Sequence, residues 1–376
     1  MKASTAQILN KPITKAILSI IIGMLVAAIF LAAAGFDPVT SFGALFYGAL
    51  GKPKYISNVI IKATPIILTG VGVAFAFRTG LFNIGAEGQY IAGTIFAVMA
   101  GYIFNLPPVL EIPLIILAGT AAGALVGALI GWLKAKFGIH EVITSIMFNW
   151  IALYFNNYIC ATKFFHAPNS TSTYPIHPSG YTMILPNWKM SPEGLETLRP
   201  IPWLYNTLVK TDVNIGILVA IASAIFISWL LRRTWTGFEM RAVGFNPDAS
   251  KFTGINMERN IVLSMLISGA LCGLAGALII TGTTPHAIST LAAFENYGFN
   301  GLSVAVIAGS SPIGCIFAGL LFSGLLYGAQ TVQQVVGAPS DIINIMIGTI
   351  VFAMALSAIM PVFIEKFQKR GVKHVK

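Results

Sequence analysis

The sequence predicts an all-α, polytopic membrane protein with about ten transmembrane helices, some of them broken or re-entrant, and a short helix on the cytoplasmic side. Of the 376 residues, 56% are hydrophobic and only 10% are charged, whereas a soluble domain carries about 25% charged residues. The 23 Lys and Arg residues outnumber the 13 Asp and Glu residues and lie at the ends of apolar runs, as expected for the flanks of membrane helices. These observations exclude a soluble globular protein, a disordered chain and a nucleic-acid binder.

Charged, polar and proline-containing clusters divide the chain into apolar runs, and about 20 apolar residues span a bilayer core. The predicted helices cover 16–36, 56–77, 81–101, 112–133, 142–162, 214–231, 260–281, 297–310, 313–330 and 342–362. The first run resembles a signal peptide, but the rest of the chain is equally apolar, so we expect an uncleaved helix and a single transmembrane domain over 1–376. Cys160, Cys272 and Cys315 lie far apart in apolar runs and are predicted to be packing residues.

The distribution of positive charge predicts the orientation of these helices. With the N-terminus inside, sixteen Lys and Arg residues fall on the cytoplasmic side, and Lys62 lies within a predicted helix and is not counted. The six on the outer side are Lys52, Lys54, Lys163, Lys189, Arg199 and Lys210. Because cytoplasmic loops carry the excess of Lys and Arg, this distribution places both termini in the cytoplasm.

The eighth predicted helix, 297–310, is too short to cross a bilayer at 1.5 Å per residue. The polar sequence Ser310-Ser311-Pro312 separates it from the ninth. This pattern favours a broken or re-entrant helix pair, which requires a covering of protein or water. One tilted helix kinked at Pro312 is the alternative.

Two loops are longer than connectors need to be. The outer loop, 163–213, contains seven of the nineteen prolines with aromatic residues between them, which predicts an ordered extracytoplasmic cap with little regular structure. The cap either meets an external partner or places its aromatic rings at the level of the lipid headgroups.

The inner loop, 232–259, contains the start and stop signals of a short cytoplasmic helix. Asn246 is a typical N-cap, Pro247 fits the first position, Asp248 suits the positive end of the helix dipole, and Gly254 ends the helix. The expected apolar anchors are Ala242, Val243, Phe252 and Ile255. So well marked a helix is typical of a docking element, although a purely structural loop is the alternative.

Glu87 is the one acidic residue that the predicted helices place at membrane depth. It lies in the run Phe82-Asn83-Ile84-Gly85-Ala86-Glu87-Gly88-Gln89. An ionisable group in hydrocarbon is costly and therefore indicates function, and Asn83 and Gln89 add hydrogen-bond donors and acceptors. The alternative is that Glu87 lies near the cytoplasmic surface and has a structural partner there.

Further polar residues lie in the predicted helices. The sequence Phe299-Asn300-Gly301 resembles Phe82-Asn83. In the predicted topology the helix with the first motif runs from inside to outside and the helix with the second runs from outside to inside, as in an inverted repeat with a binding site near the midplane. Asn149 and Asn156 share one face of the fifth helix. They either bind a polar solute or join helices by hydrogen bonds. The sequence contains no phosphate-binding loop and no metalloprotease or serine-hydrolase motif, so we do not expect an enzyme.

Three segments together resemble the permease subunits of ABC importers in the branched-chain amino acid and simple-sugar superfamily. They are 82–89, then 241–255 followed by 268–277, and 298–309 followed by Pro312. The form Asn-Ile-Gly-Ala-Glu-Gly-Gln is similar to the nucleoside-import branch. Ser250 stands where an Ala is more usual, and Asn300 where the family often has an acidic or a small residue.

This resemblance implies a multi-pass protein of the bacterial cytoplasmic (inner) membrane that works with partners. These are two cytoplasmic ATPase subunits that bind ATP and Mg, a second permease subunit that is expected to differ from this one, and an external nucleoside-binding protein or lipoprotein. The chain itself is expected to bind no cofactor or metal. Permeases for simple sugars or branched-chain amino acids, or an ion-coupled secondary transporter, are the alternatives.

The resemblance also implies roles for individual residues. The expected substrate pathway comprises Phe82, Asn83, Glu87, Gln89, Asn149 and Asn300. The residues expected to couple the chain to the ATPase are Arg241, Asn246, Pro247, Asp248, Ala249 and Gly254.

Overall fold

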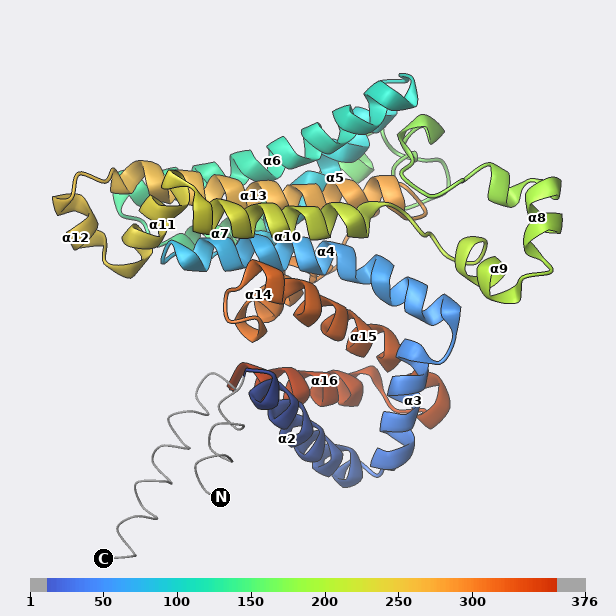
Figure 1. Ribbon diagram of the computed structural model, residues 1–376. Helices are drawn as coiled ribbons and strands as arrows, with labels where there is room; N and C mark the ends of the chain where they lie inside the picture. The colour runs from blue at the N-terminus through green and yellow to red at the C-terminus, as the bar shows by residue number, and fades with distance from the viewer. Residues whose placement is uncertain (1–11, 357–376) are drawn as a thin grey trace, which may run out of the picture. The chain divides into compact units, whose positions relative to one another are not determined.

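The computed structural model describes residues 12–356, and helices with connecting loops account for all of them apart from three isolated β-bridges. The helices are α2 (Pro12–Ala33), α3 (Pro38–Leu50), α4 (Pro53–Arg78), α5 (Ala86–Ile103), α6 (Pro108–Phe137), α7 (Glu141–Ala161), α8 (Pro192–Leu198), α9 (Pro202–Leu208), α10 (Gly216–Arg233), α11 (Trp235–Phe245), α12 (Pro247–Phe252), α13 (Met257–Gly282), α14 (Tyr297–Ile307), α15 (Pro312–Val336) and α16 (Ser340–Ala355). The predicted all-α class is confirmed (Figure 1).

Each of the ten predicted apolar runs contains a helix. Five of these helices, α4, α6, α10, α13 and α15, are long and apolar enough to cross a membrane. The protein is therefore a polytopic membrane protein. The end of the last predicted run lies outside residues 12–356, as do seven of the basic residues counted on the cytoplasmic side, Lys2, Lys11, Lys366, Lys369, Arg370, Lys373 and Lys376.

The sequence did not predict α3, which begins directly after the first run. Asp37 caps it by accepting hydrogen bonds from the backbone N–H groups of Val39 and Thr40. A 13-residue helix is shorter than a membrane span requires. The local cap therefore accounts for a helix that hydropathy alone does not reveal.

The chain divides into two compact units, and the prediction of one transmembrane domain stays a prediction. The first unit joins Met1–Lys52 with Gly324–Lys376, and the second is Pro53–Ser323. In the first unit, α2 packs against α3 and α16. A methyl group on Gly48 of α3 would lie 2.2 Å from the hydroxyl of Thr331, so only glycine allows α3 and the end of α15 to pack this closely.

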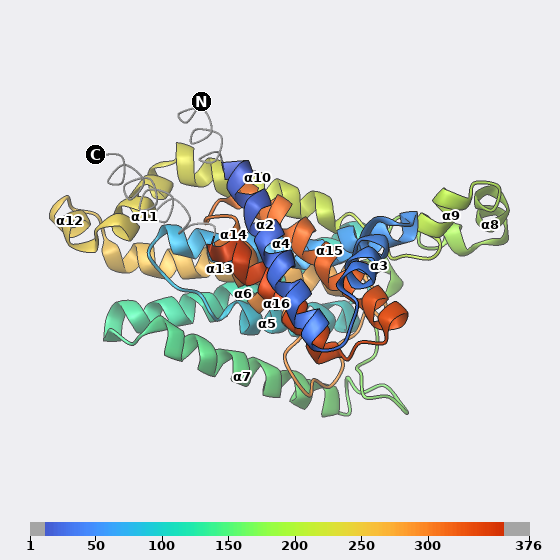
Figure 2. The same cartoon turned by 90° about the horizontal axis from the view of Figure 1, so that it is seen from below.

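In the second unit, α13 lies at the centre and packs against α4, α5 and α6 (Figures 1 and 2). Glycines spaced by four residues on α6 face those on α13. A methyl group on Gly123 would lie 2.4 Å from the carbonyl oxygen of Gly269, and one on Gly127 would lie 2.1 Å from that of Met265. Small residues bring the two backbones together, as is typical of membrane helices. These neighbours cover most of α13.

The predicted break after the eighth run is confirmed. α14 ends at Ile307, and Gly309 and Ser310 then adopt positive φ angles of 58° and 56° before α15 begins at Pro312. Two residues in the left-handed region cannot continue a helix. The chain therefore forms two helices rather than one helix with a kink.

α14, with 11 residues, is less than half as long as the 26-residue α4 that it lies along. At its start, the hydroxyl of Thr69 in the middle of α4 donates to the carbonyl of Tyr297, and after its end, Arg78 at the end of α4 donates to the carbonyl of Ser310. α15 then returns along α4, because the hydroxyl of Ser323 donates to the carbonyl of Val59. The 283–296 loop connects the end of α13 to the start of α14.

α5 begins beside the start of α14. A Cβ atom on Gly298 would lie 2.2 Å from the backbone nitrogen of Glu87, so the first turns of the two helices touch. α14 runs toward the end of α4 that holds Arg78, and α5 runs away from it. Two helices that start together and run in opposite directions are what the predicted inverted arrangement requires.

The predicted outer cap, 163–213, is ordered and holds the end of α13. Ile176 donates to the carbonyl of His286, and Thr182 donates to that of Thr281. Short 3₁₀ turns and the two seven-residue helices α8 and α9 supply the regular structure. In Figure 1 these helices lie at the opposite end of the second unit from α12.

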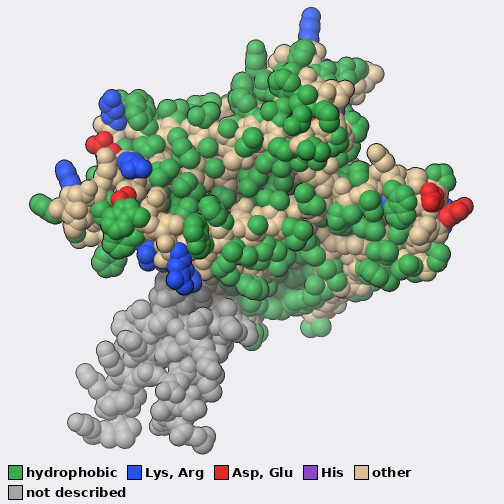
Figure 3. All heavy atoms as spheres, turned by 45° about the horizontal axis from the view of Figure 1, so that its top comes forward, with side chains coloured by type: hydrophobic (Ala, Val, Ile, Leu, Met, Phe, Trp, Pro, Cys, Tyr) green, Lys and Arg blue, Asp and Glu red, His purple; other side chains and the backbone are tan. Residues whose placement is uncertain are grey.

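The surface between these ends is apolar. Figure 3 shows hydrophobic side chains over much of the middle of the visible face, and charged side chains of both signs gathered toward the end that holds α11 and α12 and at α8. On α7, exposed apolar and aromatic residues include Ile143, Met147, Ile151, Tyr154 and Tyr158. Such a belt suits contact with lipid chains. Cys160, Cys272 and Cys315 are buried, which confirms them as packing residues.

Candidate functional site

The short helix predicted in the inner loop is confirmed as α12. Asn246 accepts a hydrogen bond of 3.0 Å from the backbone N–H of Ala249, Pro247 is the first helical residue, and Asp248 lies in the first turn. Gly254 follows the last turn with a φ of +82°. Each of these residues acts on backbone within a few positions of itself, which is why the sequence alone reveals the helix.

The predicted anchors of α12 are only partly correct. Val243 is buried, and Ala242 and Ile255 are partly buried, but Phe252 is 93% exposed. The prediction that Phe252 anchors the helix is wrong, because α12 turns Ser250, which is buried, toward the protein instead. The helix is anchored by a small polar residue that the hydropathy pattern does not single out.

The helix α11, which precedes α12, was not predicted. Thr234 caps it by accepting from the backbone N–H of Gly237, and it buries Met240 and Val243. Phe245, at its end, is 95% exposed. Phe245 and Phe252 therefore project from the two ends of α12, and their exposure is unusual for such large apolar side chains.

The pair α11–α12 lies directly on the turn that leads into α5. A Cβ atom on Gly244 would lie 2.3 Å from the carbonyl oxygen of Arg78, and Gly80 in the same turn has a φ of +76°. Beside this contact, Arg78, Arg232 and Arg241 line a depression of about 180 Å³ that extends to the turn between α14 and α15. The turn between α4 and α5 and the turn between α14 and α15 therefore both lie beside the α11–α12 surface.

The loop after this turn is held by a network of buried amides and hydroxyls. Asn83 donates to Gln89 at 2.9 Å and to the hydroxyl of Ser268 at 2.7 Å. Asn149 of α7 accepts from the backbone N–H of Gly88 at 2.8 Å and donates to the carbonyl of Ile84. These bonds support the structural alternative for Asn149, since each joins α7 to the start of α5.

Glu87 lies at the junction of α5 and α14. Its side chain is fully buried, and its two carboxylate oxygens accept from the backbone N–H groups of Asn296 at 2.7 Å and Gly298 at 2.6 Å. α14 has no side-chain cap of its own, so Glu87 satisfies donors that the start of a helix leaves unpaired. The carboxylate joins two helices that are far apart in the sequence.

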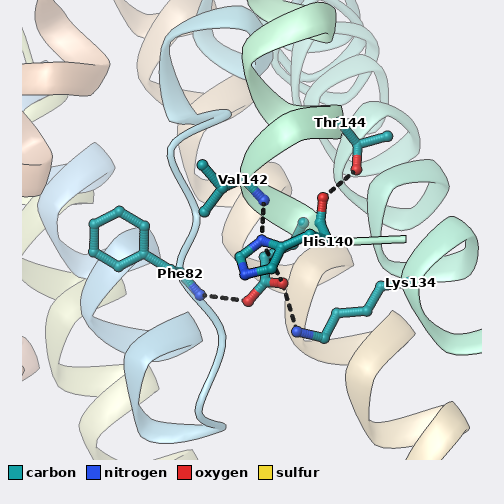
Figure 4. A network of polar contacts seen from close by, with 6 residues as sticks. Phe82, Lys134, His140, Val142 and Thr144 are labelled. Atoms are coloured by element: carbon teal, nitrogen blue, oxygen red, sulfur yellow. Dashed lines mark hydrogen bonds and ion pairs between the residues drawn. The ribbon is translucent and has the colours of Figure 1, made fainter. Parts of the chain in front are cut away.

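A second carboxylate, at Glu141, fixes the other side of the same loop and was not predicted. Figure 4 shows Lys134 and the backbone N–H of Phe82 reaching the carboxylate between the ends of α6 and α7. The Lys134 ammonium lies 2.5 Å from one carboxylate oxygen, and the Phe82 N–H lies 3.4 Å from the other. In the figure, His140, Val142 and Thr144 complete the start of α7. The loop is therefore held from three helices.

The structure brings four of the predicted pathway residues together. Asn83, Glu87, Gln89 and Asn149 surround the start of α5, and their polar atoms bond to the protein. Phe82 is 39% exposed on the loop before them. Asn300 lies in the first turn of α14 and is partly exposed. The predicted cluster is a packed junction between helices.

A cavity of about 360 Å³ lies next to this junction, and none of the six predicted pathway residues lines it. Its walls come from α4, α5, α7, the end of α13, the 283–296 loop and Asp212 of the outer cap. Asn156 of α7, whose amide donates to the carbonyl of Ser289, lines it and holds that loop. The cavity was not predicted, because its lining residues share no local pattern in the sequence.

Comparison with known proteins agrees with this architecture. Residues 55–355 match the family described as branched-chain amino acid transport system / permease component. The chain is 37% identical over 355 residues to the guanosine ABC transporter permease protein NupP of Bacillus subtilis (strain 168), covering 94% of this chain and 96% of that protein.

Two further relatives are permease proteins. The nucleoside ABC transporter permease protein NupB of Lactococcus lactis subsp. cremoris (strain MG1363) is 35% identical, covering 93% of this chain and 92% of that protein. The guanosine ABC transporter permease protein NupQ of Bacillus subtilis (strain 168) is 30% identical, covering 71% and 79% respectively. This chain belongs to the family of the branched-chain amino acid transport system permease component.

Proposed function

We propose that this chain is a transmembrane permease subunit of an ATP-binding-cassette importer that passes nucleosides across the bacterial inner membrane. The proposal rests on the similarity, over 94% of the chain, to a permease protein named for guanosine transport. The capped helix α12 also supports it. Phe245 and Phe252 are exposed at the ends of this helix and offer a surface on which an ATPase can dock.

The proposed topology has ten crossings, with both termini and α12 in the cytoplasm. The end of the second unit that holds Arg78, Arg232 and Arg241 is the basic end that the positive-inside rule assigns to the cytoplasm. The 283–296 loop and α14 together make the proposed eighth crossing, since the 11 residues of α14 are too few to cross a bilayer alone. Irregular backbone at membrane depth is tolerated where protein covers it.

The ATPase is proposed to dock on the α11–α12 surface. The docking residues are Arg241, Asn246, Pro247, Asp248, Ala249 and Gly254, to which the structure adds Phe245 and Phe252. A displacement of α11 would be transmitted through the close contact of Gly244 with Arg78 and Gly80 to the loop that leads into α5. ATP binding on the partner would in this way alter the junction of α5 and α14, because packed interfaces switch between discrete arrangements.

The remaining partners follow from the importer architecture. ATP and Mg bind to the partner ATPases, and this chain supplies the route and no bond chemistry. The ordered cap, 163–213, is the proposed contact for the external binding protein or lipoprotein. A second, different permease completes the pair, as NupP and NupQ of one organism are both named for guanosine.

Passage of the solute along the predicted pathway residues stays a prediction. These are Phe82, Asn83, Glu87, Gln89, Asn149 and Asn300. The bonds that Asn83, Glu87 and Asn149 make support a role in holding the loop and the two helix starts in place. Their contribution to transport would then be positional.

Competition for uptake tests the substrate class. With the complete importer in proteoliposomes, unlabelled uridine and adenosine are expected to reduce the uptake of labelled guanosine, because each carries an aromatic base on the same ribose. Ribose and leucine are expected to have no effect at the same concentration. Competition by leucine or ribose, with none by nucleosides, would instead support a permease for branched-chain amino acids or simple sugars.

A further inference from the structure

We propose that the cavity of about 360 Å³ receives the nucleoside on its way through the permease and discriminates against phosphorylated nucleotides. Its volume lies in the range of about 300–1,000 Å³ that small-molecule sites occupy. The proposal rests on the proposed function, because it assigns a place in this chain to the substrate of that importer. It assigns Tyr297 to stacking on the base. It also assigns the exclusion of phosphate groups, here called the charge filter, to the carboxylates of Asp212 and Glu295.

The position of the cavity suits a solute that arrives from outside. Asp212, in the outer cap, and Thr284, after the end of α13, lie in its wall, and the backbone N–H of Thr284 donates to the carboxylate of Asp212 at 3.0 Å. At the other extreme, Tyr297 begins α14 at the level of Thr69 in the middle of α4. The cavity therefore extends from the outer cap to the junction of α5 and α14.

An aromatic side chain is available to a base. Tyr297 lines the cavity and is partly exposed, whereas Tyr90 lies behind it, fully buried, with the ring centroids 5.2 Å apart. Tyr297 therefore packs against the buried ring of Tyr90 and also forms part of the cavity wall. Because every base has a π-face, such a surface accepts purine and pyrimidine nucleosides alike.

The polar groups of the cavity suit hydroxyls and base edges. The carboxylates of Asp212 and Glu295 and the amide of Asn58 lie in its wall. Carboxylates accept hydrogen bonds from ribose hydroxyls and from base N–H groups. The hydroxyl of Tyr90 lies beside the carboxylate of Glu295, and both residues line the cavity, so a polar group of a solute can meet a donor and an acceptor in this corner.

The charges disfavour a phosphate group. Lys62 is the cationic residue of the lining, against the two carboxylates of Asp212 and Glu295. The start of α14 would otherwise attract an anion through its backbone N–H groups. Those of Asn296 and Gly298 are already bonded to Glu87. A nucleoside monophosphate would bring further negative charge into a lining in which two carboxylates face one cationic residue.

Weak binding to the permease is the quantity to measure. The importer without its binding protein is placed in nanodiscs, and saturation-transfer NMR records contact of guanosine or guanosine monophosphate with the wild-type protein. Guanosine is expected to give a signal and guanosine monophosphate none. Tyr297→Ala should weaken guanosine binding roughly tenfold through the loss of stacking, whereas Tyr297→Phe keeps the ring and should bind as the wild type does.

The charge filter has its own variant. Glu295→Lys is expected to give a signal with guanosine monophosphate, because the lining then carries two cations against one carboxylate. Glu196→Lys, the same change at an exposed position on α8 outside the cavity, is the matched control and should give none. An equal signal from both nucleotide and nucleoside in the wild type would overturn the filter.

The outcomes separate this proposal from the proposed function. If the complete wild-type importer takes up guanosine but Tyr297→Ala binds and transports it as the wild type does, the cavity proposal is wrong and the permease function stands. If the complete wild-type importer takes up no nucleoside, the proposed function itself fails. Since Tyr297 bonds to Thr69 through its backbone carbonyl, the side-chain variants leave that bond in place.

Discussion

Gly254→Pro is expected to reduce nucleoside uptake by the importer about tenfold or more, while the permease still inserts in the membrane. Gly254 ends α12 with a φ of +82°, and the proline ring fixes φ near −65°. The end of α12 would therefore have to rearrange. The change lies on an exposed loop and leaves the packing of the α6–α13 pair untouched, so the loss should fall on coupling to the ATPase.

Gly254→Asn is the matched control for this prediction. Asparagine tolerates the left-handed region, and no atom lies within 4 Å of a Cβ atom built at this position. Uptake and the stimulation of ATP turnover by loaded binding protein should be close to wild type in the asparagine variant and low in the proline variant. Full stimulation in both would remove the reason for placing the ATPase on α12.

Glu87→Ala is expected to lower the amount and the thermal stability of the folded permease. The carboxylate accepts from the backbone N–H groups of Asn296 and Gly298. Alanine leaves the buried N–H of Gly298 without a partner, at a cost of about 1–3 kcal/mol, and also removes the bond to the part-buried N–H of Asn296. Glu87→Gln keeps one acceptor oxygen and should lose less. The melting temperature of the purified protein in detergent distinguishes wild type, Gln and Ala in that order.

The same variants test the ion-coupled alternative. If Glu87 carries protons, Gln and Ala should be equally inactive in uptake per folded molecule, and wild-type uptake should follow the proton gradient. If Glu87 holds α14 in place, Gln should retain part of its uptake per folded molecule. Equal inactivity together with full sensitivity to an uncoupler would contradict the structural role.

Local chemistry explains which parts of the fold the sequence reveals. The cap at Asn246, the proline at 247 and the turn at Gly254 each act on neighbouring backbone, and α12 is found where they predict it. Phe252 was expected to be an anchor and is exposed. Its burial depends on which face of α12 meets the protein, and six residues give no periodicity from which to infer that face.

Contacts between residues far apart in the sequence could not be predicted at the site either. The rule for ionisable groups at membrane depth singled out Glu87, but its partners are backbone N–H groups of a segment more than 200 positions away, and backbone has no sequence signature. Tyr297 and Asp212 meet in one cavity only because the 283–296 loop folds back toward α4. By contrast, the glycines of α6 recur every four residues, and this spacing in the sequence is typical of closely packed membrane helices.

ATP-dependent uptake is the most direct test of the proposed importer. This chain, its ATPase, the second permease and the binding protein are reconstituted in vesicles, and labelled guanosine uptake is measured with ATP held constant, with and without an uncoupler. Uptake is expected only when every component and ATP are present, and the uncoupler should not change it. Uptake by this chain alone that follows an ion gradient, or ATP turnover by this chain alone, would contradict the account.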